Sequence, residues 1–333
     1  MLGLIPEVKN TITFTLTKQD GSEETRSYVH TMGELSGEEE LKLQQTEAAE
    51  ERETVTDGLY VILGNDSDEE DFMYYYDNSG ILRGEIPLIG YRSHRLLFRN
   101  DRMYYSISEN QIVAVNRLGK VEMIYDTGAY SLHHDYVFDD DGNILVLATD
   151  TESESVEDQI IKINTQTGEI SRVLDLGELF PDYKEACTVN EDGELDWMHI
   201  NTIQWVGDDE IILSSRETST ILRITDIYGS PKVKYMIGEE SFWEGTGYEE
   251  LLFEKDESLG AFSNTGGQHS VTYVKDETLN AGEYYLYLFN NNFGTSNSKP
   301  SYDWEQIDGI ETSMKKGTAS YYYKYKINEN DGT

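Results

Sequence analysis

Short apolar runs separated by turn sequences make up most of the chain after residue 55. The runs are rich in β-branched and aromatic residues and are bounded by pairs such as Asp-Gly and Thr-Gly, which is typical of β-strands joined by tight turns. They fall into five successive groups, which begin at GLYVILG, HRLLFRN, HHDYVF, HINTIQWV and QHSVTYV. Similar antiparallel units that follow one another in this way predict an all-β fold of the β-propeller type rather than a sandwich.

The pattern divides the chain into three expected regions. Residues 1–32 read as one hairpin around a Gln-Asp-Gly turn. An isolated hairpin is marginal in water, so we interpret it as the remainder of an N-terminal β-sandwich-like domain. Residues 33–54 are acidic and contain no aromatic residue, which favours a linker that is helical in part. Residues 55–333 are expected to form the propeller, with further chain beyond the final tyrosine-rich strand.

One predicted hairpin, HINTIQWVGDDEIILSSR, carries polar groups at its open end. A two-residue Asp-Asp loop would place Gly207 opposite Glu210. The same register places Asn201 opposite Arg216, and His199 lies on the same face of its strand as Asn201. The three polar side chains are therefore expected to converge. A loop of three or five residues would shift the register and separate them.

Histidines recur at matching points of three successive units. His134, His199 and His269 each stand at the start of the first strand of their unit. In a propeller the first strand of each blade lines the central channel, so equivalent positions converge around the axis. We therefore expect three imidazoles to surround one mouth of the channel.

Three interpretations of this ring are open. The histidines could be channel-lining groups that bind water or carbonyls. They could bind a transition metal, for which neutral imidazole is the commonest ligand, but the guanidinium of Arg216 would repel a divalent cation. Third, the Arg fork could bind a tetrahedral oxyanion such as sulfate or phosphate, while a neutral histidine attacks the central atom. We favour this third interpretation, which requires no cofactor and no metal.

The composition excludes some classes of binding partner and does not indicate the cellular compartment of the protein. A formal charge of −38 argues against nucleic acid and against an anionic membrane surface, because both need clustered Lys and Arg. Cys187 is the single cysteine, which excludes an intramolecular disulfide. No apolar run is long enough to span a bilayer, and the N-terminus does not resemble a signal peptide.

Four motifs in a fixed order point to a known family. They are HHD at 133–135, DWMHIN at 196–201, SSR at 214–216 and GGQHS at 266–270. Together with LGLIPEVKNTITFTLT and TVTDGLYVIL near the start, they resemble the bacterial arylsulfate sulfotransferases over nearly the whole chain. None of the motifs is specific alone. The resemblance implies a six-bladed propeller, of which about five blades are recognisable here, so we expect a C-terminally truncated copy.

The resemblance also implies a reaction and roles for residues. Family members move a sulfuryl group from a phenolic sulfate ester to another phenol without a nucleotide donor. By resemblance, His269 is the nucleophile that becomes transiently sulfated, and His199 and Arg216 hold the sulfuryl oxygens. His134 would assist at the phenolic oxygen, with His133 as the alternative. Because adjacent strand residues point to opposite faces, only one of this pair is expected to serve.

Three further residues are candidates for substrate binding: Asn201 from the register above, Tyr91 as an aromatic or hydroxyl contact, and Trp197 as a platform that stacks on a phenol. The expected partners are small phenolic sulfates and phenols, with no nucleic acid and no membrane, and a homodimer is one oligomeric state open to the chain. Family resemblance implies an exported protein. The alternative function is a non-catalytic propeller that binds aryl sulfates or other small anions.

Overall fold

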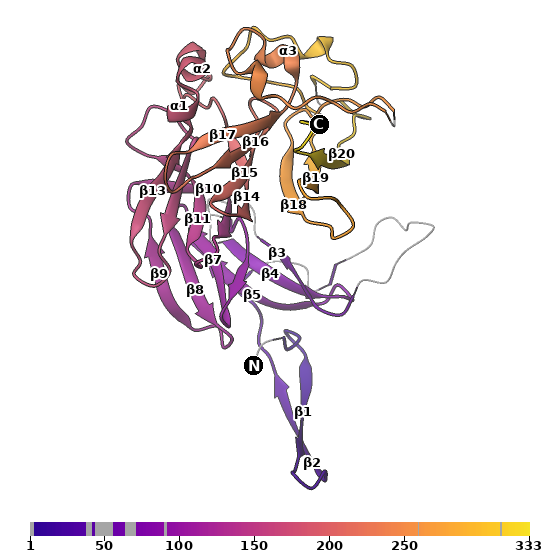
Figure 1. Cartoon of the computed structure of the whole chain (residues 1–333). Helices are drawn as coiled ribbons and strands as arrows, with labels where there is room; N and C mark the ends of the chain where they lie inside the picture. The colour runs from indigo at the N-terminus through magenta and orange to yellow at the C-terminus, as the bar shows by residue number, and fades with distance from the viewer. Residues whose placement is uncertain are drawn as a thin grey trace. The chain divides into compact units, whose positions relative to one another are not determined.

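The computed structural model describes residues 3–37, 42–43, 56–63, 71–89, 92–258, 260–313 and 315–333 (Figure 1). Most of the linker expected over residues 33–54 lies outside the described residues, and so does Tyr91. Within the described residues the chain is almost entirely β-structure, with five successive antiparallel sheets after an N-terminal hairpin. This is a five-blade β-propeller arrangement, and it confirms the predicted fold class and the five predicted groups of strands.

The hairpin and the sheets, here called blades 1 to 5, are built from consecutive strands. The hairpin pairs β1 (Lys9–Thr17) with β2 (Glu23–Thr31). Blade 1 contains β3 (Leu59–Ile62), β4 (Asp71–Asp77) and β5 (Leu82–Leu88). Blade 2 contains β6 (Leu97–Arg99), β7 (Arg102–Ser108), β8 (Gln111–Asn116) and β9 (Val121–Asp126). Blade 3 contains β10 (Tyr130–Phe138), β11 (Ile144–Asp150), β12 (Gln159–Ile163) and β13 (Ile170–Asp175). Blade 4 contains β14 (Ile200–Gly207), β15 (Glu210–Ser215), β16 (Thr220–Thr225) and β17 (Lys232–Ile237). Blade 5 contains β18 (His269–Val274), β19 (Glu283–Asn290) and β20 (Tyr321–Asn328).

Helical turns occur only in the connections between strands of the described chain. They are α1 (Leu176–Leu179), α2 (Pro181–Ala186), α3 (Glu240–Trp243) and the 3-10 turns at Glu249–Leu251 and Trp304–Gln306. Asp175 caps α1, since its side chain accepts a hydrogen bond from the backbone N–H of Gly177. None of the helices in the described ranges is long and apolar enough to cross a membrane.

The chain forms two compact units, Met1–Ile124 and Tyr125–Thr333. The first unit buries a small core between blades 1 and 2 that includes Met73, Leu88 and Tyr105. The domain boundary predicted at residue 32 stays a prediction. The candidate histidines all belong to the second unit, so the rest of the description concerns blades 3 to 5.

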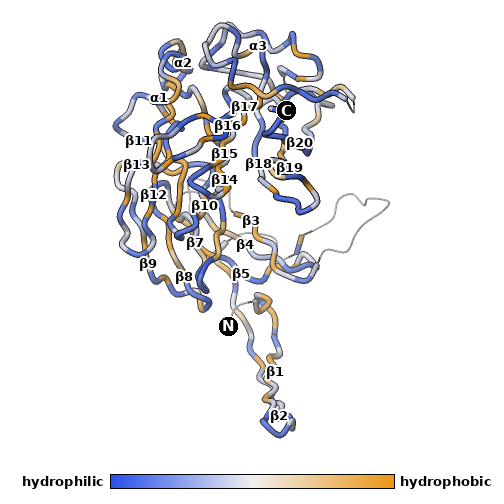
Figure 2. The backbone as a smooth tube through the Cα atoms, in the orientation of Figure 1, coloured by the Kyte–Doolittle hydropathy of each residue, from blue (hydrophilic) through white to orange (hydrophobic). Residues whose placement is uncertain are grey.

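The core of the second unit lies between blades and beneath the helical connections. Strands β11, β15 and β16 are buried along almost their whole length, which explains their continuous runs of Ile, Leu and Val (Figure 2). Helices α1 to α3 cover one end of this core with aromatic rings such as Phe180, Trp243 and Phe242, which are fully buried. Because the side chains of this core are fully buried and closely packed, the inner strands β10, β14 and β18 are held in fixed positions.

Each inner strand of the second unit contains a β-bulge near its start. A residue in the left-handed backbone region lies within or just before the irregularity: His134 with φ 47°, His199, which immediately precedes β14, with φ 46°, and Ser270 with φ 54°. Non-glycine residues adopt this conformation uncommonly, and a bulge changes the face to which the following side chains point. The third of these residues is Ser270 rather than His269, so the histidine of blade 5 stands one residue before the left-handed position.

Side chains beside the bulges connect neighbouring blades. The carboxylate of Asp135 accepts a hydrogen bond of 3.1 Å from the backbone N–H of Ile203 in the next blade. The amide of Asn201 donates one of 2.8 Å to the carbonyl of Gln268, just before blade 5. Blades 3, 4 and 5 are thus connected in sequence along their inner strands.

The predicted hairpin of blade 4 forms with its expected loop but with a different register at its open end. Gly207 faces Glu210, as predicted, and the loop residues Asp208 and Asp209 both have positive φ, as a two-residue type I′ turn requires. Two single-residue irregularities in β14 then shift the pairing. The predicted pairing of Asn201 with Arg216 is therefore wrong.

Candidate active site

Imidazole rings from three consecutive blades converge in the second unit. The ring of His134 on β10 lies 5.0 Å from that of His199 and 6.1 Å from that of His269, measured between ring centroids. His199 immediately precedes β14, and His269 is the first residue of β18. The starts of the three inner strands therefore bring together histidines that lie far apart in the sequence.

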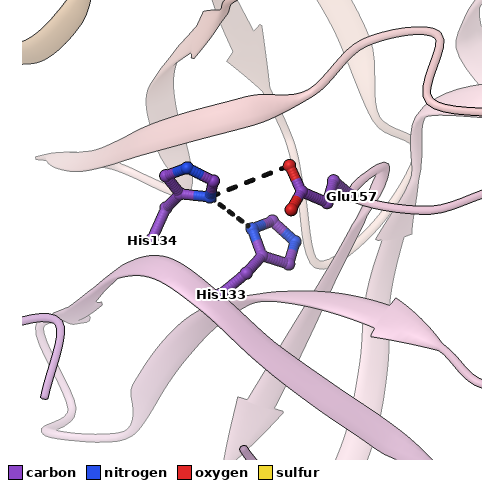
Figure 3. Close-up of side chains that lie close together, drawn as sticks. All are labelled: His133, His134 and Glu157. Carbon is purple, nitrogen blue, oxygen red and sulfur yellow. Dashed lines mark hydrogen bonds and ion pairs between the residues drawn. The ribbon is translucent and has the colours of Figure 1, made fainter. Parts of the chain in front are cut away.

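The rings of His133 and His134 lie side by side and both face Glu157 (Figure 3). Their Nδ1 atoms are 3.3 Å apart, and a hydrogen bond between them requires one ring to donate and the other to accept. The expectation that adjacent strand residues point to opposite faces is wrong here, because the bulge and the left-handed backbone of His134 interrupt the alternation. Burial lowers the pKa of both rings, that of His134 to about 2, so both are neutral.

His199 is enclosed by two carboxylates. Its Nδ1 lies 2.7 Å from Oδ2 of Asp196 and 2.9 Å from Oε2 of Glu157. Burial alone would lower the pKa of His199, but the interactions with Asp196 and Glu157 outweigh it and raise the pKa to about 9. Burial likewise opposes ionisation of Glu157, yet the contact with His199 brings the pKa of this carboxyl down to about 2. At neutral pH His199 is therefore an imidazolium.

Arg216 supplies a second positive charge beside His199. Its Nη1 lies 3.3 Å from Nδ1 of His199 and 3.4 Å from Oε1 of Glu217. Glu217 is fully buried and accepts hydrogen bonds from the backbone N–H groups of Asn297 and Ser298. Because a protonated Nδ1 is itself a donor, the contact between Arg216 and His199 sets two cations side by side rather than forming a hydrogen bond. The carboxylates behind them offset the repulsion.

His269 has a defined tautomer. Its Nδ1 lies 3.0 Å from the carbonyl oxygen of Gly267. A carbonyl can only accept, so Nδ1 carries the hydrogen and Nε2 carries the lone pair. Burial lowers the pKa of His269, and the nearby charges of His199 and Arg216 act in the same direction. The ring is neutral at neutral pH, and Nε2 is its basic nitrogen.

The predicted substrate-binding residues have different surroundings. Asn201 is 6 % exposed, and its amide is hydrogen-bonded to Gln268 and to Thr202. Trp197 is fully buried, with its indole N–H donating to Asp158, so it packs in the core and has no open face on which a phenol could stack. Tyr91 lies outside the described residues.

Two overlapping groups of side chains in the described residues have the composition of metal ligands. They are His133, His134 and Glu157, and Glu157, Asp196 and His199, with ligand atoms within 4.8 Å of one another. The guanidinium of Arg216 beside His199 disfavours a cation in the second group. Arg216 and the imidazolium of His199 are two positive groups beside the neutral ring of His269, and this part of the cluster can bind an anionic substrate.

Glu157, Asp196 and Glu217 were not among the residues selected from the sequence. Glu157 stands in the acidic segment ESESVED, which reads as a solvated loop, and Glu217 follows the SSR motif. Asp196 opens the DWMHIN motif three residues before the histidine that it contacts. This last spacing is the one signal from which an acidic partner could have been expected.

The arylsulfotransferase (ASST) family model matches residues 44–333. A search of curated proteins found no match. Similar solved structures include a streptogramin B lyase, with 14% identity, a TM-score of 0.38 and coverage of 77% of this chain and 69% of the other. The Pan2 WD40 domain of Neurospora crassa has 10% identity, a TM-score of 0.40 and coverage of 83% and 64%. At these scores the two structures carry no functional argument. The match over most of the chain, which includes every histidine of the cluster, decides the family: the chain belongs to the arylsulfotransferase (ASST) family, and this membership supports aryl sulfotransfer as its general activity.

Proposed function

We propose that the protein transfers a sulfuryl group from an aryl sulfate to a phenol in two steps through a sulfated His269. The observation that carries this proposal is the convergence of three imidazoles beside Arg216, with His134 lying 5.0 Å from His199 and 6.1 Å from His269 between ring centroids. Family membership supports the reaction class, and the geometry supports the assignment of roles.

In the first step the donor ester ArO–SO₃⁻ binds with its sulfuryl oxygens toward Arg216 and His199. The lone pair on Nε2 of His269 attacks sulfur, an N–S bond forms, and the S–O bond breaks with its electron pair on the phenolate oxygen. Charge in a loose transition state spreads over the equatorial oxygens, where fixed positive donors stabilise it. A phenolate leaves more readily than an alkoxide, so aryl esters are the preferred donors.

In the second step the oxygen of an acceptor phenol attacks sulfur and the N–S bond breaks. His134 is the residue assigned to the phenolic oxygen: as a neutral imidazole it gives a hydrogen bond to the departing oxygen, and the proton of the incoming phenol passes through it to solvent, so that the ring is neutral again at the end of the cycle. Each step exchanges one bond to sulfur, so the enzyme returns to its starting state without an external reductant, oxidant or nucleotide.

The proposal is tested with 4-nitrophenyl sulfate as donor. We expect release of 4-nitrophenol to depend on added phenol, and mass spectrometry of the enzyme mixed with donor alone to find one sulfated peptide, containing His269. His269→Asn should lose both signals, whereas His30→Asn, which alters an exposed histidine of the N-terminal hairpin, should keep them. Equal release in water alone would identify a sulfatase. Binding of the ester without release would identify a binding protein.

A further inference from the structure

Hydrogen bonds to both its N–H and its carbonyl hold the backbone of Glu157. It lies in the connection between β11 and β12 and has φ 55°, in the left-handed region. Its N–H donates a hydrogen bond of 2.9 Å to the hydroxyl of Thr149, and its carbonyl accepts one of 3.1 Å from the N–H of Ile200. The loop of blade 3 is therefore attached to the first residue of β14, immediately after His199. An uncommon conformation held in this way needs a reason.

The carboxylate of Glu157 points toward His133 and His134 (Figure 3). Its Oε2 lies 2.9 Å from Nδ1 of His199 and 3.8 Å from Nδ1 of His134. Asp196 contacts the same nitrogen of His199, but it belongs to the segment that leads into His199 itself. Glu157 is thus the one acidic contact of His199, among the described residues, that comes from a different blade.

The charges around His199 come from every element that packs against it. The anionic groups are Glu157 and Asp196, and Arg216 is the cationic one. The remaining titratable neighbours are the imidazoles of His133, His134 and His269, which burial keeps neutral. The charge of His199 therefore depends on the two carboxylates, since burial and Arg216 both oppose it.

We propose that Glu157 is a positioning residue for sulfuryl transfer, which holds His199 as an imidazolium with Nδ1 directed at the carboxylates and Nε2–H left to bind a sulfuryl oxygen. This inference rests on the proposed function. An imidazolium whose Nδ1–H is taken by a carboxylate can give its second N–H to substrate only in one ring orientation. Asp196 takes the Nδ1–H in a hydrogen bond of 2.7 Å, and the charge of Glu157, 2.9 Å from the same nitrogen, keeps the ring protonated in that orientation.

The direct test is an NMR titration of protein labelled at its histidines, with His199 assigned from the spectrum of His199→Gln. In the unmodified protein the titration midpoint of His199 is expected near pH 9. Glu157→Gln keeps the shape of the side chain and removes its charge, so the midpoint should move to lower pH by about one unit or more. Glu154→Gln changes an exposed carboxylate of the same loop and should leave the midpoint in place.

The same variants test whether the charge of His199 affects the rate of sulfuryl transfer. In Glu157→Gln the alkaline limb of kcat/KM should move to lower pH together with the NMR midpoint, and Glu157→Asp, which keeps the charge, should return it part of the way. Melting curves confirm that each variant is folded. An unmoved midpoint, or a moved midpoint with an unmoved alkaline limb, would overturn the inference. Absence of a sulfated peptide from the unmodified protein would instead reject the proposed function, and the NMR midpoints do not depend on that result.

Discussion

The backbone N–H of Arg216 donates a hydrogen bond of 3.1 Å to the carbonyl of His199, and the Arg216 side chain ends 3.3 Å from the imidazole of the same residue. The regular hairpin register would have paired Arg216 with Asn201 instead. Each of two single-residue irregularities in β14 moves the pairing by one residue, and together they bring the two positively charged side chains to one place.

Arg216→Lys should lower kcat/KM for 4-nitrophenyl sulfate by about 10²–10³-fold. Lysine keeps the charge but lacks the planar fork that binds two oxygens of a tetrahedral anion. Steady-state rates at saturating phenol measure the effect. The control is Arg172→Lys, at an exposed ion pair on β13, which should behave as the unmodified protein. A full rate in Arg216→Lys would remove this side chain from the transition state.

The ion pair of His199 with Glu157 should contribute to stability only over a limited pH range. The folded pKa of His199 is raised from 6.5 to about 9, so its contribution is complete below pH 6.5 and is lost as pH rises through 9. The folded pKa of Glu157 is lowered from 4.5 to about 2, so its contribution is complete above pH 4.5 and is lost as pH falls toward 2.

The difference in Tm between the unmodified protein and His199→Gln should therefore be greatest between pH 4.5 and 6.5 and decline on both sides. Differential scanning calorimetry across buffers of constant ionic strength provides the measurement. The exposed carboxylates titrate equally in both proteins, so their effect on the pH dependence of Tm cancels in the difference. A difference that does not vary with pH would show that His199 contributes by packing alone.

Glu217→Gln should destabilise the protein by about 1–3 kcal/mol and also weaken catalysis. The buried carboxylate accepts hydrogen bonds from the backbone of Asn297 and Ser298 and lies 3.4 Å from Arg216. In glutamine an NH₂ group replaces one carboxylate oxygen, and this group would face one of these N–H donors instead of accepting a hydrogen bond from it. Urea unfolding measures the loss, and Glu191→Gln, in an exposed turn, is the matched control. Unchanged stability would mean that the carboxyl group is already protonated.

Trp197→Phe should lower stability and leave KM unchanged. The substitution removes the indole N–H that donates to the fully buried Asp158, which keeps its contacts with Ser155 and Lys184. We expect a cost of about 1–3 kcal/mol from the lost hydrogen bond and the smaller ring. Thermal unfolding and a donor titration of the initial rate separate the two effects. A raised KM at unchanged Tm would restore the interpretation of Trp197 as a platform for the phenol.

The five blades and the Asp-Asp turn could be predicted because alternation, strand length and turn chemistry are local properties of the sequence. The convergence of His134, His199 and His269 followed from the repeat. Their contacts could not be predicted in the same way, because regular alternation does not reveal where a bulge interrupts a strand, and no glycine marks the positive φ of His134 or His199.

The acidic residues of the site could not be predicted from the sequence for a different reason. Glu157 belongs to a chain with 64 Asp and Glu residues, so one more acid in a loop carries no signal. Only the spatial relation between two blades makes it a partner of His199. Trp197 shows the opposite error: its place beside a motif residue suggested substrate contact, whereas its ring faces the interior.

The connections from Asp135 to Ile203 and from Asn201 to Gln268 have a consequence for folding. Each joins residues more than sixty positions apart in the sequence, so neither can form before two neighbouring blades have docked. Contacts of such high sequence separation form late and are slow to nucleate. The histidine cluster therefore needs blades 3, 4 and 5 to be docked, and a chain in which blade 5 has not yet docked would have His134 and His199 in place without His269.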